Sequence, residues 1–154
     1  MDMLIHLARM GGGAAHTGAA DLRKPIGPEH TAVTAWVQDH FGPGWASEVQ
    51  VALGNRPVSA WFAMQGGDLL GFCCYDATAR GFVGPIGVVE SAQRRGIGAS
   101  LLRVCLADMR AAGYGYAVAG HVGAPEFFRR VAGAVEIAGS TPGLYQGVLM
   151  PRRG

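Results

Sequence analysis

The amino-acid sequence predicts a mixed α/β fold in which helices cover both faces of one sheet. Short apolar runs bounded by Gly, Pro and Asp alternate with segments whose apolar residues recur at helical spacing. The length of 154 residues suits one domain with a substantial core. Hydrophobic residues make up 49% of the chain, which is too large a share for a disordered protein.

The expected elements follow from these patterns. The expected strands span residues 2–9, 22–24, 58–64, 69–75, 82–89, 116–122, 135–137 and 144–150. The expected helices span residues 28–40, 45–53, 96–112 and 126–131. Gly84-Pro85 lies inside one strand and should produce a bulge, because proline cannot donate a ladder hydrogen bond. We expect one domain over residues 1–154, with an N-terminal strand and Gly-rich loop in residues 1–19 and a core in residues 20–150.

Charge and hydropathy exclude several classes of function. The formal net charge is +2, and the only basic run is the short tail 151–154, so no nucleic-acid-binding surface is predicted. No apolar stretch reaches the roughly 18 residues that would span a bilayer, and residues 1–7 lack the basic start of a signal peptide. We therefore expect a cytoplasmic protein without a membrane partner. Because only 16% of the residues are charged, much of the surface must be small or apolar, which favours a homodimer.

The cysteines do not indicate a disulfide framework or a metal site. Cys73, Cys74 and Cys105 make an odd count, and no CxxC or paired His/Cys spacing is present. Cys73 and Cys74 are adjacent in a strand-like run, so their side chains should point to opposite faces of the sheet. We interpret all three as small core residues and expect no metal.

The segment 87–99 is the most informative about function. A strand-like run ends there, a glycine-bearing turn follows, and a helical pattern begins. The first N–H groups of a helix have no internal partner, and the helix dipole favours an anion at that end. Gly96 and Gly98 lack the Cβ atoms that would hold a phosphate away, while Arg94 and Arg95 add positive charge. The junction therefore predicts a pyrophosphate-binding site.

Two other phosphate-binding patterns do not fit this junction. A dinucleotide-binding turn needs a third glycine, but Leu101 stands three residues after Gly98. That fold also needs an acidic residue at the end of the next strand, and the run 116–121 has none. A Walker loop needs Gly-Lys-Ser/Thr, which is absent here. On glycine spacing alone, a second interpretation is as good as the pyrophosphate site: Gly96 and Gly98 would only permit a tight turn from strand to helix, with no ligand bound.

The wider pattern resembles the GNAT acetyltransferase superfamily. Residues 93–98, Gln-Arg-Arg-Gly-Ile-Gly, match its Q/R-x-x-G-x-G/A signature. Residues 22–29 look like its first strand and helix start, 70–72 like its third strand, and 124–130 like its last helix. The tract 84–88, Gly-Pro-Ile-Gly-Val, further resembles a bacterial subgroup.

The resemblance covers about residues 20–150 and implies a fold and a co-substrate. The implied fold is a mixed, mostly antiparallel sheet of about seven strands, flanked by about four helices. Its fourth and fifth strands, here 82–89 and 116–122, are implied to splay apart around acetyl-CoA. Ile86, Gly87 and Val88 are implied to pair with the pantetheine arm, and the Val88 N–H to hold the oxyanion. The residues implied to bind the pyrophosphate are Gln93, Arg94, Arg95, Gly96, Ile97, Gly98 and Ala99.

The groups that would move protons are less defined. Phe128, which we also place in the cofactor site, stands where the family often has a tyrosine that protonates the leaving thiolate. The remaining candidates each have a structural alternative. Glu48 also fits a solvated helix face, and His121 also fits a strand-end residue. Asp76 is interpreted first as a turn cap, while Tyr145 would either replace the missing tyrosine or pack.

Two functions follow from these observations. The first is an N-acetyltransferase in which a primary amine of a small molecule or peptide attacks acetyl-CoA directly. The second is a non-catalytic acetyl-CoA-binding module or sensor, favoured by Phe128 and by the absence of a carboxylate in the run 82–89. A third class, a different nucleotide-binding domain, lacks the acidic residue that would bind a ribose.

Overall fold

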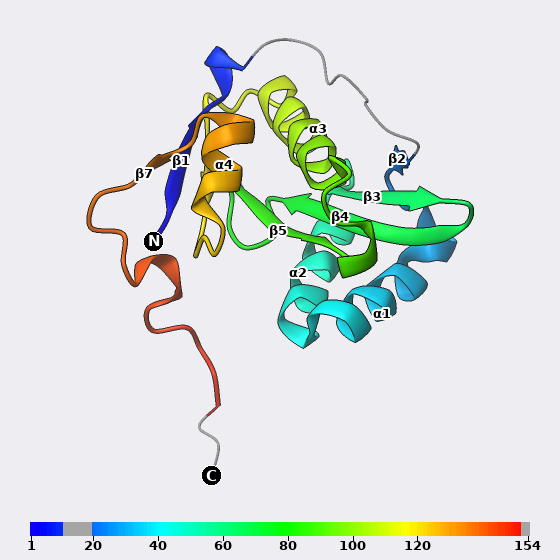
Figure 1. Cartoon of the computed structure of the whole chain (residues 1–154). Helices are drawn as coiled ribbons and strands as arrows, with labels where there is room; N and C mark the ends of the chain where they lie inside the picture. Colours follow the sequence, from blue (N-terminus) through cyan, green and yellow to red (C-terminus); the bar gives the residue numbers. More distant parts are fainter. Residues whose placement is uncertain (11–19, 152–154) are drawn as a thin grey trace.

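The computed structural model describes residues 1–10 and 20–151, whose strands form one seven-stranded sheet (Figure 1). The strands are β1 (Met3–His6), β2 (Asp21–Arg23), β3 (Ala60–Gln65), β4 (Asp68–Tyr75), β5 (Phe82–Val88), β6 (Tyr116–Ala119) and β7 (Val135–Glu136). Their order in the sheet is β2-β3-β4-β5-β6-β1-β7, and every neighbouring pair is antiparallel except β5 and β6. The predicted mixed, mostly antiparallel sheet is confirmed.

Helices cover both faces of the sheet, as predicted. The α-helices are α1 (His30–Phe41), α2 (Pro43–Gly54), α3 (Ile97–Ala111) and α4 (Pro125–Ala132), and the 3-10 helices are η1 (Leu7–Arg9), η2 (Gly27–Glu29), η3 (Glu90–Ala92) and η4 (Gly143–Tyr145). The helices α1 and α2 lie on one face and α3 and α4 on the other (Figure 1). Within the described ranges, no helix is both long enough and apolar enough to cross a membrane.

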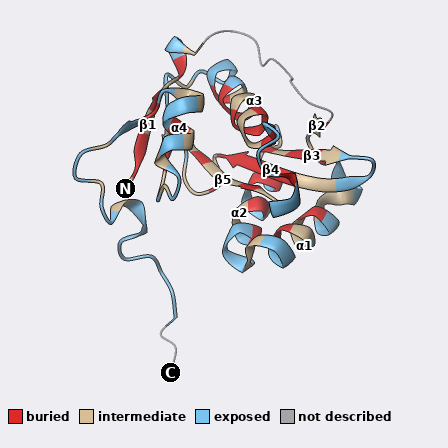
Figure 2. Cartoon of the chain, viewed as in Figure 1, coloured by how far each residue is buried: buried red, intermediate tan, exposed pale blue. Residues whose placement is uncertain are grey.

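Each face of the sheet has its own apolar core, so the buried residues concentrate along the strands and the inner sides of the helices (Figure 2). Leu101 and Met109 of α3 belong to one core, while Val37 of α1 belongs to the other. Cys73 lies in the first core and Cys74 in the second, as strand alternation predicts. Burial raises the pKa of the Cys74 and Cys105 thiols, so these side chains act as apolar core residues.

The strands β5 and β6 separate after a short stretch of pairing, which creates the gap that holds the candidate site. Only Phe82 and Val83 of β5 pair with β6, although β5 continues to Val88. On its other edge, Ile86 pairs with Cys73 and Val83 pairs with Tyr75. Three steps along β5 therefore match two along β4, so an extra residue bulges at Gly84-Pro85. Both the bulge and the splayed strands are confirmed.

The N-terminal and C-terminal segments differ from the prediction. The first strand stops at His6 and continues as η1. The prediction of a strand over 144–150 is wrong, because η4 begins this segment and Gly147, with φ of 73°, interrupts the extended run. The strand β1 instead lies between β6 and β7, where Met3 pairs with both Ala119 and Glu136. The expected Gly-rich connection 11–18 and the end of the basic tail, 152–154, lie outside the described residues.

Candidate functional site

A cavity of about 740 Å³ lies where β5 and β6 separate. The two strands supply its walls, and the start of α3 and the side of α4 close one end. The other end is lined by Trp45 and Glu48 of α2, by Thr78 from the loop after β4, and by Tyr145 of η4. The cavity therefore runs from the α3/α4 face of the sheet to the α2 face.

The turn before α3 forms the first end of this cavity. Gly96 precedes the helix in a left-handed conformation with φ of 77°, and the space where a Cβ atom would lie is open to 4 Å. The helix begins at Ile97, so the N–H groups of its first turn have no intrahelical partners. Arg94, in the turn itself, and Arg130 of α4 also line the cavity and supply positive charge. The arrangement suits a phosphate or pyrophosphate group.

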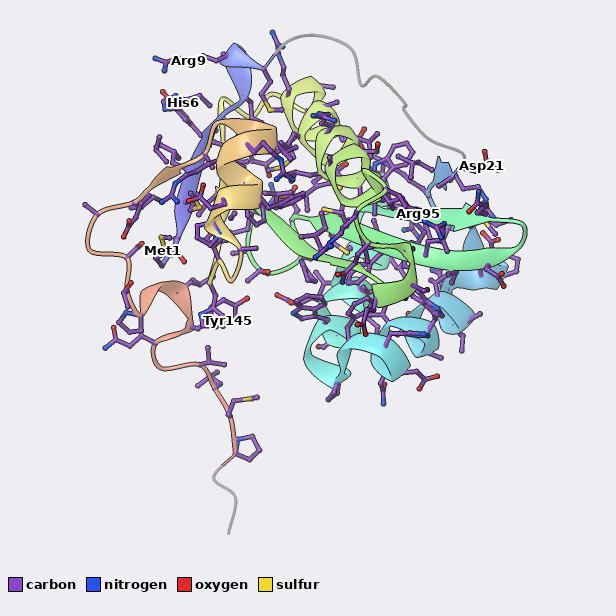
Figure 3. All side chains as sticks on the ribbon, viewed as in Figure 1. Met1, His6, Arg9, Asp21, Arg95 and Tyr145 are labelled. Carbon is purple, nitrogen blue, oxygen red and sulfur yellow. The ribbon has the colours of Figure 1, made fainter. Side chains whose placement is uncertain are left out.

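Other members of the predicted loop have different roles. Gly98 lines the cavity but is also a packing position, since a Cβ atom there would lie 3.6 Å from both Phe127 and Val88. Gln93 donates from Nε2 to the Val88 carbonyl at 3.1 Å, which ties the turn back to β5. Arg95 does not line the cavity. Its guanidinium contacts Gln65 Oε1 at 3.4 Å and the Ser91 carbonyl at 3.3 Å. Figure 3 labels Arg95.

The strand β5 and the helix α4 line the cavity between its two ends. Ile86, Gly87 and Val88 of β5 and Phe128 of α4 are the lining residues there, while Ile97 and Ala99 line the cavity from the first turn of α3. Gly87 also lets the α1/α2 layer approach the sheet, because a Cβ atom there would lie 2.8 Å from the Phe41 ring and 3.0 Å from the Trp45 ring. Phe128 is 8% exposed and belongs to the same apolar core as Leu101 and Met109 of α3. The α4 side of the cavity therefore carries an aromatic ring without a hydroxyl group.

The second end of the cavity gathers groups that can exchange protons. The Thr78 hydroxyl donates to Glu48 Oε1. Burial, followed by the Glu48 carboxylate, raises the pKa of Tyr145. The His121 ring lies 5.3 Å from the Tyr145 ring, measured between centroids, and Figure 3 shows Tyr145 on the C-terminal segment. The structure thus brings three of the candidate acid and base residues, Glu48, His121 and Tyr145, to one place.

Asp76 lies apart from this group. Its two carboxylate oxygens accept the Tyr114 hydroxyl at 2.9 Å, and Oδ1 also accepts the Gly81 N–H at 2.8 Å. The residue has φ of 51° at the start of the loop that leads to β5 and does not line the cavity. These contacts are those of a turn cap.

Sequence reasoning missed several residues that line the cavity or contact its lining. Thr78 and Arg130 line it; Thr78 belongs to no motif, and Arg130 ends the run 124–130 without any local feature that separates it from a surface arginine. Asp2 was also missed; it is 8% exposed, and its Oδ1 accepts the His121 N–H at 2.9 Å. No local pattern could have found this bond, since the two residues are 119 positions apart. In the part of the chain that is described, no three His, Cys, Asp or Glu residues are grouped to hold a metal.

The Acetyltransferase (GNAT) family matches residues 28–134 of this chain. A search of curated proteins by sequence finds no match.

Solved structures share the fold at low sequence identity. A GCN5-related N-acetyltransferase from Sphaerobacter thermophilus superposes with a TM-score of 0.70 at 23% identity over 87% of this chain and 47% of its own. The glucosamine N-acetyltransferase region of a fungal multi-domain GH3 β-N-acetylglucosaminidase gives 0.69 at 15% identity over 85% of this chain and 19% of its own. A GNAT family acetyltransferase from Brucella melitensis, in complex with acetyl-CoA, gives 0.50 at 23% identity over 72% and 80% of the two chains. This chain thus spans less than half the length of the first two proteins.

Proposed function

Because the chain belongs to the GNAT acetyltransferase family, we propose that it transfers the acetyl group of acetyl-CoA to a primary amine of a small molecule or peptide. One observation carries the proposal. A single cavity joins an open anion cradle at Gly96 to a cluster of Glu48, Thr78 and Tyr145 on the opposite face of the sheet. An acyl carrier entering from one side can therefore meet an amine entering from the other.

In this proposal the backbone of the turn before α3 holds the co-substrate. The residues that we assign to the pyrophosphate are Gln93, Arg94, Gly96, Ile97, Gly98 and Ala99, all of which line the cavity. Arg130, which lines the same cavity, adds positive charge. The strand β5 offers Ile86, Gly87 and Val88 to the pantetheine arm, and the Val88 N–H is assigned to the oxyanion.

The proposed reaction is direct transfer. The amine nitrogen attacks the acetyl carbonyl carbon, the C–S bond breaks, and CoA leaves as a thiolate. The amine must lose a proton, and the thiolate must gain one. Glu48 is the one carboxylate among the described cavity-lining residues, so we assign it as the base. Tyr145 has a raised pKa and keeps its proton at neutral pH, so we assign it as the acid in place of Phe128. His121, beside Tyr145, is the alternative for either role.

A second function, acetyl-CoA binding without transfer, is favoured by one observation. Phe128 lies against the cavity where the family often has its tyrosine, and it cannot donate a proton. Both functions require acetyl-CoA binding, which calorimetry measures. Only transfer requires that an amine increases the release of free CoA, which a thiol reagent detects. A panel of cationic, neutral and anionic amines decides between them, and binding without thiol release from any amine would favour the sensor.

A further inference from the structure

Met1 and Asp2, the two residues before β1, contact residues that line the cavity at the end that we assign to the amine. The Asp2 carboxylate accepts the His121 N–H through Oδ1 at 2.9 Å, and the Met1 carbonyl accepts the Val122 N–H at 2.9 Å. Asp2 is 8% exposed, which is unusual for a carboxylate unless hydrogen bonds satisfy it. In Figure 1 the N-terminus lies next to η4, the turn that carries Tyr145. Residues from both ends of the chain thus meet beside the candidate acid and base groups.

The same residue also holds the segment that leads to Tyr145. The Asp2 carbonyl accepts the Ile137 N–H at 2.9 Å, and the Asp2 N–H donates to Ser140 Oγ at 2.8 Å. Gly143 packs directly on the side chain, since a Cβ atom there would lie 2.9 Å from both carboxylate oxygens. Only glycine permits this approach, and Gly143 also has φ of 70°. Asp2 therefore contacts the chain on both sides of the His121–Tyr145 ring pair.

The bond to His121 has a clear mechanical consequence. His121 has φ of 49°, a left-handed conformation that is uncommon for a residue with a side chain and that surrounding contacts stabilise. A charge-assisted hydrogen bond from its own N–H is such a restraint. The imidazole of the residue restrained in this way lies 5.3 Å from the Tyr145 ring, measured between centroids.

We propose that Asp2 is a positioning residue: its carboxylate holds His121 and the Gly143–Tyr145 turn so that both rings face the amine end of the cavity. The effect on acetyl transfer rests on the proposed function, whereas the effect on geometry does not. Asp2 itself is not assigned a proton-transfer role, because it acts through the backbone of the residues it holds.

Three variants separate positioning from general stability. Asp2→Ala removes the acceptor of the His121 N–H. Asp2→Asn keeps an oxygen acceptor of the same shape and removes the charge. Ser140→Ala is the matched control, since it removes both contacts of the Ser140 hydroxyl with the Asp2 backbone, with the N–H and with the carbonyl, but leaves the bond from His121 to the Asp2 carboxylate. Thermal unfolding and the dissociation constant for acetyl-CoA are measured for each variant to identify any that fold poorly.

The first measurement does not depend on activity. In the wild-type protein the rings of His121 and Tyr145 should give a nuclear Overhauser effect. We expect it to be lost in Asp2→Ala and retained in Asp2→Asn and Ser140→Ala. The proposal is overturned if Asp2→Ala keeps the effect while folded. This result decides the positioning role even if no variant acetylates any amine, an outcome that would refute only the proposed transfer.

The second measurement uses an amine that the wild-type protein acetylates. Asp2→Ala should lower kcat/KM for the amine by about tenfold, the equivalent of one lost hydrogen bond to a charged group. The dissociation constant for acetyl-CoA should change by less than about twofold, since the cradle lies at the other end of the cavity, and Asp2→Asn should recover most of the loss. Equal losses in amine turnover and acetyl-CoA binding would instead show a general structural role and contradict the proposal.

Discussion

Thr78 donates a hydrogen bond from its hydroxyl to the carboxylate of Glu48, which joins the loop after β4 to α2 across the end of the cavity that we assign to the amine. The bond directs Glu48 toward the region that Tyr145 and His121 also line. A carboxylate held in this way is oriented before the substrate arrives, which is what a general base requires.

Replacement of Glu48 by Gln should therefore lower kcat/KM for the amine by about a hundredfold, within the usual contribution of a general base. Thr78→Val should have a smaller effect of about threefold to tenfold, because it removes one orienting hydrogen bond. Steady-state kinetics at saturating acetyl-CoA measures both. Glu136→Gln is the control, since Glu136 is an exposed carboxylate on β7, away from the cavity. A wild-type rate in Glu48→Gln would remove Glu48 from the mechanism.

Tyr145 is expected to supply the proton that Phe128 cannot. Tyr145→Phe should reduce kcat by about tenfold to a hundredfold and leave acetyl-CoA affinity unchanged. Because the pKa of Tyr145 is raised, its hydroxyl stays protonated through the neutral range, so loss of its proton should not lower activity below about pH 10. A pH–rate profile of the two proteins measures this.

Phe128→Tyr provides the matched test of the same role. Phe128 lines the cavity from α4, so a hydroxyl placed there faces the same space as Tyr145. In the Tyr145→Phe background, this second change should restore part of the lost kcat. If the double variant is no faster than Tyr145→Phe, and Tyr145→Phe itself is as fast as the wild type, neither position carries the acid.

The sequence predicted the features that depend on local spacing. The apolar stripe of α3, its glycine-bearing start at Gly96 and the bulge at Gly84-Pro85 all follow from residues close together in the chain. The insertion of β1 between β6 and β7 could not be predicted, because strand pairing depends on which edges remain free in the assembled sheet. The apolar run 144–150 has a strand-like composition, yet Leu149 is 97% exposed and η4 replaces the expected extended start.

In the candidate site, too, the sequence predicted the features with a local signature and not those that depend on contacts between distant segments. The anion cradle was predicted because helix N-termini and glycine turns have a local signature. The assignment of proton-transfer groups depended on contacts between distant segments, such as Asp2 with His121. The homodimer and the amine acceptor stay predictions.

A stability prediction concerns Asp108 of α3. Its carboxylate joins the helix to β3, to β4 and to the residue directly after β2. Its Oδ2 accepts the Trp61 Nε1–H at 2.9 Å and the Tyr75 hydroxyl at 3.1 Å, and it lies 2.8 Å from Lys24 Nζ. Asp108→Ala leaves these partly buried donors without a partner and should cost about 2 kcal/mol of unfolding free energy. Chemical denaturation measures the change.

Glu126→Ala is the control for that experiment. Glu126 pairs with Arg129 on α4, but its side chain is 82% exposed, and exposed ion pairs contribute little to stability. Its loss should change the unfolding free energy by less than about 0.5 kcal/mol. Equal effects of the two variants would show that the Asp108 cluster is no more than a surface ion pair.

The central claim is that the turn at Gly96 binds the phosphates of acetyl-CoA. Gly96→Glu would place a negative side chain in the open space before α3, whereas Gly113→Glu would place the same charge just beyond the other end of that helix. Both glycines have positive φ, 77° and 99°, so each replacement strains the backbone.

Isothermal titration calorimetry with acetyl-CoA, on the wild-type protein and both variants, tests the claim most directly. The account predicts binding to the wild-type protein and to Gly113→Glu, and no detectable binding to a folded Gly96→Glu. Unchanged affinity in Gly96→Glu would contradict it.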